Sequence, residues 1–291
     1  MHCRPLIGLL SDPLRPLTIP AITSLPPPES VLDAPWGLPS AAAGAGTSAG
    51  PGLTLVGVGP GDPELLTVAA VRAIAAAAVV AYPVARDGAD GMAATIAAPW
   101  IAAAQRRLPL LFPMVAEAEP RRRAWAEAAD RLAAEVATGR SVVLLCEGDV
   151  SLFATSSYVL LALRQRHPEC PVQLLPGISA VAAAAAAAAW PLALQQEGLL
   201  IRPTPDTPEA FEALLELAAA QDWVLGLLKL GHRWTWVRPV LERRGLLAGA
   251  LFAQRVGWPD QRLEPAGAVP AETSPYFSLL LLRQGTPAVL P

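Results

Sequence analysis

Three segments of the chain combine glycine with an acidic or hydroxyl side chain directly after an apolar run. They are Gly57–Thr67 (GVGPGDPELLT), Val142–Phe153 (VVLLCEGDVSLF) and Leu174–Ala180 (LLPGISA). Glycine lets the backbone approach a ligand closely, and ligands of open α/β sheets collect at the carboxyl ends of the strands. The pattern therefore predicts a ligand site built from strand-to-helix turns.

Two acidic residues in these turns have a structural interpretation beside the functional one. Asp62 is a good helix N-cap, and Pro63 and Glu64 suit a first helical turn. Asp149 would either cap a helix that starts near Ser151 or contact a ligand at the end of its strand.

A dinucleotide-binding fingerprint is the competing interpretation of the first turn. That fingerprint needs glycine or alanine where the chain has Asp62, and a carboxylate at the end of the second strand, which here ends Ala81-Tyr82-Pro83. An acid at the helix start would also repel a pyrophosphate. A ligand without phosphate fits better, and a nicotinamide-dependent oxidoreductase is kept as an alternative.

Short apolar runs alternate with longer helical patterns along the chain, and this alternation indicates which elements must position the turns. This alternation predicts a parallel sheet from strands at 53–58, 79–82, 108–112 and 142–146. A second set follows 171–175, with strands at 198–201, 223–228, 251–256 and 276–282. No helix separates the last two strands, so we expect a mixed sheet there. The run Ala182–Ala189 is expected to be a packed helix.

Composition and charge exclude several classes of protein. The 291 residues are 53% hydrophobic and 16% charged, which excludes a disordered chain. The net charge of -3 favours neither nucleic acid nor an anionic membrane as a partner. The mean hydropathy of +0.39 reflects alanine, and the richest apolar window, Val181–Trp190, is too short to span a membrane. We therefore expect a soluble, cytoplasmic protein.

Neither a metal site nor a disulfide framework is expected, because the cysteines and histidines lack ligand spacing; they are Cys3, Cys146, Cys170, His2, His167 and His232. Residues 1–51 are rich in proline, alanine, glycine and serine, which predicts a disordered or mis-started leader without the form of a secretory signal. Two α/β domains are expected at 52–170 and 171–285, followed by a tail at 286–291.

In their order and spacing, the three turns resemble those of the tetrapyrrole methylase family, whose members transfer methyl groups from S-adenosylmethionine to uroporphyrinogen III, corrin precursors and a few other substrates. The resemblance covers about residues 53–283. It implies two α/β domains, a parallel sheet in the first, a mixed sheet in the second, the cofactor in the cleft between them, and a homodimer. It also implies cofactor contacts at Pro60, Glu147, Gly148, Asp149, Leu152, Ser179 and Ala180, with Lys229 or Leu230 facing the adenine.

Within that family, the C-terminal half is most similar to the branch that methylates carbon 20 of precorrin-2, or of its cobalt-bearing counterpart cobalt-sirohydrochlorin, in cobalamin biosynthesis. The similar segments of this half are Leu228–Gly231, Val237–Gly245, Gln254–Arg262 and Pro275–Leu279. Thr155–Tyr158, just after the second turn, is also similar to that branch. One alternative is a methylase that acts on a later corrin precursor. Another is a cofactor-binding protein without turnover, which is suggested only by Val150 in the place of the family's usual proline.

Methyl transfer to a carbon requires no side-chain nucleophile, but a proton must leave afterwards. The candidates by type to accept that proton are Glu147, Asp149, Tyr158 and His232, and the sequence singles out none of them as catalytic. Substrate carboxylates would pair with arginine, for which the candidates near strand ends or turns are Arg86, Arg106, Arg107, Arg202, Arg233, Arg255 and Arg262. Tryptophans could stack on a flat macrocycle or pack in the core; they are Trp190, Trp223, Trp234, Trp236 and Trp258.

Overall fold

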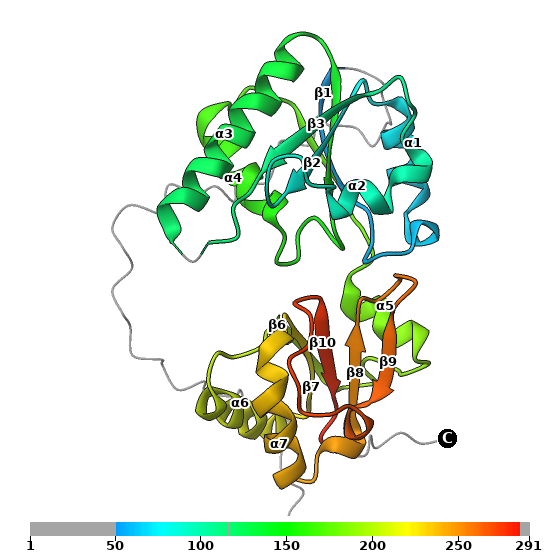
Figure 1. The fold of residues 1–291 in the computed structure, drawn as a ribbon, viewed down its shortest axis with the longest axis vertical. Coiled ribbons are helices and arrows are strands. Elements are labelled where there is room, and N and C mark those ends of the chain that lie inside the picture. Colours follow the sequence, from blue (N-terminus) through cyan, green and yellow to red (C-terminus); the bar gives the residue numbers. More distant parts are fainter. Residues whose placement is uncertain (1–50, 116, 286–291) are drawn as a thin grey trace, which may run out of the picture. The chain divides into compact units, whose positions relative to one another are not determined.

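The computed structural model describes residues 51–115 and 117–285, and its strands form two sheets (Figure 1). Residues 1–50 of the expected leader and the expected tail lie outside the described residues. The first sheet has the order β3-β2-β4-β1-β5 with every neighbouring pair parallel, as predicted. Its strands are β1 (Gly52–Gly57), β2 (Val79–Val84), β3 (Arg106–Leu111), β4 (Ser141–Cys146) and β5 (Val172–Leu175).

The position of β5 corrects one expectation about where the two halves divide. The sequence places 171–175 at the start of the second domain, whereas β5 pairs with β1, with Leu53 opposite Val172. Strand pairing joins segments more than a hundred residues apart, so position along the chain does not determine sheet membership. Apart from β5, the expected domain boundaries stay predictions.

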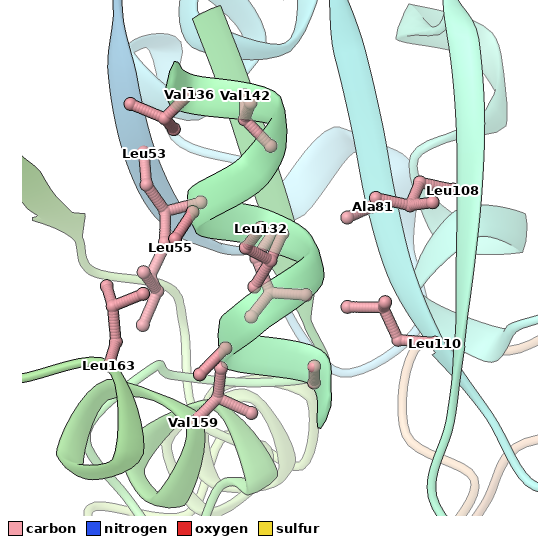
Figure 2. Close-up of a cluster of buried hydrophobic side chains, with 14 of the residues drawn as sticks. Leu53, Leu55, Ala81, Leu108, Leu110, Leu132, Val136, Val142, Val159 and Leu163 are labelled. Carbon is pink, nitrogen blue, oxygen red and sulfur yellow. The ribbon is translucent and has the colours of Figure 1, made fainter. Parts of the chain in front are cut away.

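The central strands β1, β2 and β4 are mostly buried on both faces, because successive residues of a strand point to opposite sides and helices cover both sides of the sheet. On one face, Leu53, Leu55 and Val142 pack against α3 (Ala118–Ala137) and α4 (Thr155–Arg166), as Figure 2 shows. The residues of opposite parity form the other layer, with Val56, Val58, Val143 and Leu145 packed against α1 (Val68–Ala76) and α2 (Met92–Ile96). The two helical layers explain why these strands have continuous apolar runs in the sequence.

An ionic link joins the two helices of the first layer. Asp130 on α3 accepts hydrogen bonds from Arg166 at 2.8 and 2.6 Å, and one oxygen lies 2.7 Å from the ring of His167. The hydrogen bond from Arg166, followed by that from His167, lowers the pKa of Asp130 from 3.8 to about 2.

This link should stabilise the fold only where Asp130 is ionised. A carboxyl whose pKa is lowered by folding contributes stability above its unfolded pKa, and the contribution is lost as pH falls through the folded value. We therefore expect Asp130→Asn to lower the melting temperature at pH 7 and to differ less from wild type as pH falls from about 4 toward 2. Thermal melting across this range tests it, and an unchanged difference at low pH would contradict it.

The second sheet is mixed, as predicted, with the order β6-β7-β10-β8-β9. β6 and β7 are parallel, and the pairs that involve β10 or β9 are antiparallel. Its strands are β6 (Gly198–Pro203), β7 (Trp223–Leu228), β8 (Ala250–Gln254), β9 (Arg262–Pro265) and β10 (Ser278–Leu282). The edge strand β9 was not predicted, because its four residues include two charged side chains and a proline.

Helices cover both faces of the second sheet. α6 (Pro208–Ala220) and α7 (Trp234–Arg243) pack on one face around Phe211 and Trp234. The other face is covered by α5 (Ala180–Ala187), which overlaps the predicted alanine helix but begins and ends two residues earlier than expected. It begins there because the Ser179 hydroxyl accepts a hydrogen bond from the Ala182 N–H and caps it.

Candidate functional site

The three glycine turns meet at backbone contact. A Cβ on Gly177 would lie 2.2 Å from the carbonyl oxygen of Gly148, and a Cβ on Gly57 would lie 2.5 Å from the nitrogen of Gly177. The first two turns also exchange hydrogen bonds, since the Gly148 N–H donates to the Gly59 carbonyl at 2.8 Å and the Gly59 N–H donates back at 3.3 Å. Parallel strands β1, β4 and β5 deliver the turns to the same edge of the sheet, so only glycine fits where they touch.

Asp149 ties the second turn to the third rather than capping a helix. One carboxylate oxygen accepts the Gly177 N–H at 2.9 Å, and the other accepts the Ser151 N–H at 2.9 Å together with the Ser151 hydroxyl. The structural interpretation is therefore corrected, because α4 starts only at Thr155 and its N-cap, Ala154, has no side-chain hydrogen bond. Burial acts to raise the pKa of Asp149, but the hydrogen bonds from Ser151 and Gly177 outweigh it and leave the pKa below its usual value.

The first turn is anchored by a tryptophan from the segment after β8. The Trp258 indole N–H donates to the Pro60 carbonyl at 2.9 Å, and a Cβ on Gly61 would lie 2.5 Å from the Trp258 ring. Asp62 caps a short 3-10 helix at Pro63–Leu65 through the Glu64 N–H, as its N-cap interpretation predicts.

A cavity of about 560 Å³ opens beside these turns. Eight of the nine residues that the family resemblance assigns to the cofactor line it: Pro60, Glu147, Gly148, Asp149, Leu152, Ser179, Ala180 and Lys229. The exception is Leu230, which is fully buried in the core of the second sheet. Segments scattered over 170 residues of the sequence thus share one cavity wall.

Two of the seven candidate arginines line the cavity. Arg255 is already engaged, because its Nε lies 2.7 Å from Asp260 and its guanidinium lies 4.7 Å from the Trp258 ring. The Arg86 guanidinium is exposed and makes no hydrogen bond or ion pair within residues 51–115 and 117–285. The others do not line the cavity, and three of them, Arg106, Arg233 and Arg262, are paired with Glu135, Asp206 and Glu264.

An apolar, partly solvent-facing portion of the cavity wall was missed by the sequence analysis. Met114, Phe153, Tyr276 and Phe277 are exposed large hydrophobic residues, and all four line the cavity. Phe153 has a φ of 53°, a left-handed conformation that is costly for this residue type. No periodic pattern signals residues in such loops, and of the five candidate tryptophans only Trp258 lines the cavity.

The four candidate proton acceptors fall into two groups. Glu147 and Asp149 line the cavity, whereas Tyr158 and His232 do not. The Tyr158 ring stacks on Trp125 with 4.3 Å between the ring centroids, and His232 is exposed. Burial raises the pKa of Glu147, partly offset by a hydrogen bond from the Ala93 backbone N–H.

In the part of the chain that the structure describes, no three His, Cys, Asp or Glu side chains lie together as a metal site would require. Cys146 and Cys170 are free thiols. Over the same residues, no helix combines the length and the apolar character needed to cross a membrane.

Comparison with known proteins gives matches that cover most of the described part of the chain. The model of the Tetrapyrrole (Corrin/Porphyrin) Methylases matches residues 52–268. The cobalamin biosynthesis protein CobIJ of Mycobacterium tuberculosis is 37% identical over 238 residues; the match covers 79% of this chain and 45% of CobIJ. The chain therefore spans about half the length of that relative.

Two further relatives are matched over nearly their whole length. The cobalt-precorrin-2 C(20)-methyltransferase of Salmonella typhimurium is 30% identical, with 80% of this chain and 96% of the relative covered. The precorrin-2 C(20)-methyltransferase of a Sinorhizobium species is also 30% identical, with 78% and 93% covered. Among solved structures, the methyltransferase CobJ superposes with a TM-score of 0.58 and 26% identity over 80% of this chain and 93% of its own.

Proposed function

The chain belongs to the tetrapyrrole (corrin/porphyrin) methylases, and on that premise we propose that it transfers a methyl group from S-adenosylmethionine to carbon 20 of precorrin-2 or of cobalt-sirohydrochlorin. The observation that carries the proposal is that eight of the nine family-implied cofactor residues line one cavity. The choice of carbon 20 is supported by the two relatives of that name, which the chain matches over 96% and 93% of their length.

The cavity offers S-adenosylmethionine groups of both charges and access to bare backbone. Carboxyl groups of Glu147 and Asp149 and basic groups such as that of Lys229 all line its wall, and the cofactor likewise carries both signs of charge, positive on its sulfonium and ammonium groups and negative on its carboxylate. Apart from Gly148 and its two chain neighbours, no atom of the described residues lies within 4 Å of the place where a Cβ on Gly148 would be, so a ligand can lie against bare backbone there. When bound, the cofactor supplies a methyl group on positively charged sulfur, and the residues of the three turns would hold it.

The chain's contribution to this reaction is to position the reactants and exclude water. An in-line displacement needs the accepting carbon held at near-attack distance, which can supply several kcal/mol of barrier lowering without a nucleophilic side chain. The backbone contacts among Gly57, Gly148 and Gly177 make the wall of the cavity rigid. The apolar residues Phe153 and Tyr276 provide a surface that suits a flat macrocycle.

Arg86 should bind a carboxylate of the tetrapyrrole, because its guanidinium lines the cavity and has no partner among the described residues. We expect Arg86→Gln to raise the KM for the tetrapyrrole about tenfold, as the loss of one charged hydrogen bond predicts. The affinity for S-adenosylhomocysteine should stay the same. Steady-state kinetics and calorimetry measure the two effects. The control is Arg107→Gln, an exposed arginine of β3 away from the cavity, and an unchanged KM for Arg86→Gln would refute the assignment.

The experiment that tests the proposed activity is anaerobic incubation of the full chain with S-adenosylmethionine and either precorrin-2 or cobalt-sirohydrochlorin, followed by mass spectrometry. The gain of one methyl group on either substrate is expected, and it also identifies the metal state of the substrate. No gain, with S-adenosylhomocysteine still bound, would favour a later corrin precursor or a binding protein without turnover. Thermal protection by a nicotinamide cofactor would favour the oxidoreductase instead.

Two expectations stay predictions: the homodimer, which rests on the family resemblance, and the cytoplasmic location, which rests on composition and charge. Size-exclusion chromatography with light scattering tests the first, and cell fractionation tests the second.

A further inference from the structure

Methylation at a ring carbon that already bears hydrogen leaves one proton to be removed, so the site needs an acceptor for it. The structure narrows the four sequence candidates to two, since Tyr158 and His232 do not line the cavity. The choice between Glu147 and Asp149 then depends on what each carboxylate already does.

Asp149 is committed to holding the turns together. Both of its oxygens accept hydrogen bonds from the protein, from Gly177 on one side and from Ser151 on the other. Protonating this carboxylate would break bonds that fix the cavity wall, and those bonds lower its pKa and make it a weak base.

Glu147 differs from Asp149 in each of these respects. It directly follows β4 and lines the same cavity. Its carboxyl group receives a backbone hydrogen bond from Ala93 and makes no side-chain hydrogen bond or ion pair within the described residues. Burial raises its pKa, which moves a carboxylate toward the range in which it can accept a proton near neutral pH.

The remaining ionisable groups of the cavity fit the role less well. Asp90 is exposed to solvent, and burial raises the pKa of the Cys146 thiol to about 11, so the thiol stays protonated. Besides Glu147, the ionisable groups lining the cavity are Arg86, Asp90, Cys146, Asp149, Lys229, Arg255 and Tyr276.

We propose that the carboxylate of Glu147 accepts the proton that leaves the methylated ring carbon, and that Asp149 serves to position the turns. This inference rests on the proposed function. In the step, a π electron pair of the macrocycle forms the new carbon–carbon bond while the carbon–sulfur bond breaks and its pair stays on sulfur. The C–H bond then breaks, its electron pair returns to the macrocycle, and the proton passes to Glu147. No oxidant or reductant is required.

The test separates this role from the cofactor contact that the family resemblance implies for the same residue. Glu147→Gln should lower kcat about 100-fold, which is the lower end of the usual contribution of a general base. Its affinity for S-adenosylhomocysteine, measured by calorimetry, should change less than about threefold, which corresponds to about 0.7 kcal/mol. Glu147→Asp should recover part of kcat, and Glu127→Gln, on the exposed side of α3, is the matched control.

The pH profile gives a second readout that a structural role would not move. Wild-type kcat should fall in acid with an apparent pKa above the usual value for glutamate, because the protonated form cannot accept a proton. Glu147→Gln should be slow and should lack this acidic limb. A parallel loss of S-adenosylhomocysteine affinity, or full activity of Glu147→Gln, would overturn the inference, whereas an inactive wild type that binds S-adenosylhomocysteine would refute the proposed function itself.

Discussion

Gly177→Ala should disrupt the wall of the cavity and abolish both the proposed methyl transfer and S-adenosylhomocysteine binding. The added Cβ would lie 2.2 Å from the Gly148 carbonyl oxygen and 2.8 Å from the Cα of Gly57. Each of these atoms belongs to the backbone, so no side chain can rotate away and the turns must separate. We expect a loss of about 3 kcal/mol in the free energy of unfolding, at the upper end for overpacking, measured by chemical denaturation.

The matched control for this prediction is Gly267→Ala. A Cβ on Gly267 would meet only the Leu247 side chain, at an ordinary contact distance of 3.8 Å. The free energy of unfolding of Gly267→Ala should stay within about 0.5 kcal/mol of the wild-type value. If Gly177→Ala were equally stable and still bound S-adenosylhomocysteine, the close approach of the three turns would be disproved.

Asp149→Asn should abolish activity although it preserves the shape of the side chain. Aspartate offers both oxygens as acceptors, to the Gly177 N–H and to the Ser151 N–H and hydroxyl, whereas asparagine would turn an NH₂ group toward one of these donors. The unmatched donors should cost about 1–3 kcal/mol of stability. Calorimetry with S-adenosylhomocysteine should show at least tenfold weaker binding.

Acid should remove the difference in stability between Asp149→Asn and wild type. Because hydrogen bonds keep the pKa of Asp149 below its usual value, its contribution is present above the unfolded pKa of about 4 and is lost as pH falls further. The control is Asp62→Asn, since the Asp62 carboxylate accepts only the Glu64 N–H among the described residues and asparagine is an equally good N-cap. Equal stability losses for the two variants at neutral pH would argue against the link between the turns.

The sequence alone determined the parts of this protein that depend on local pattern. The apolar run Val142–Cys146 predicted a buried parallel strand, since side chains alternate between two covered faces. Asp62 acts as the N-cap that its residue type favours. The three turns pointed to the family, and the family pointed to eight residues that line one cavity.

The tertiary structure alone decided the features that depend on which distant segments meet. It placed β5 in the first sheet through its pairing with β1, and it gave Asp149 a partner in Gly177, 28 residues away. It also selected Arg86 and Arg255 from seven arginines, and Phe153 and Tyr276 as cavity walls. Residue type and spacing record local backbone preference, whereas these contacts arise from strand register and loop packing, which bring together groups that no short sequence window contains.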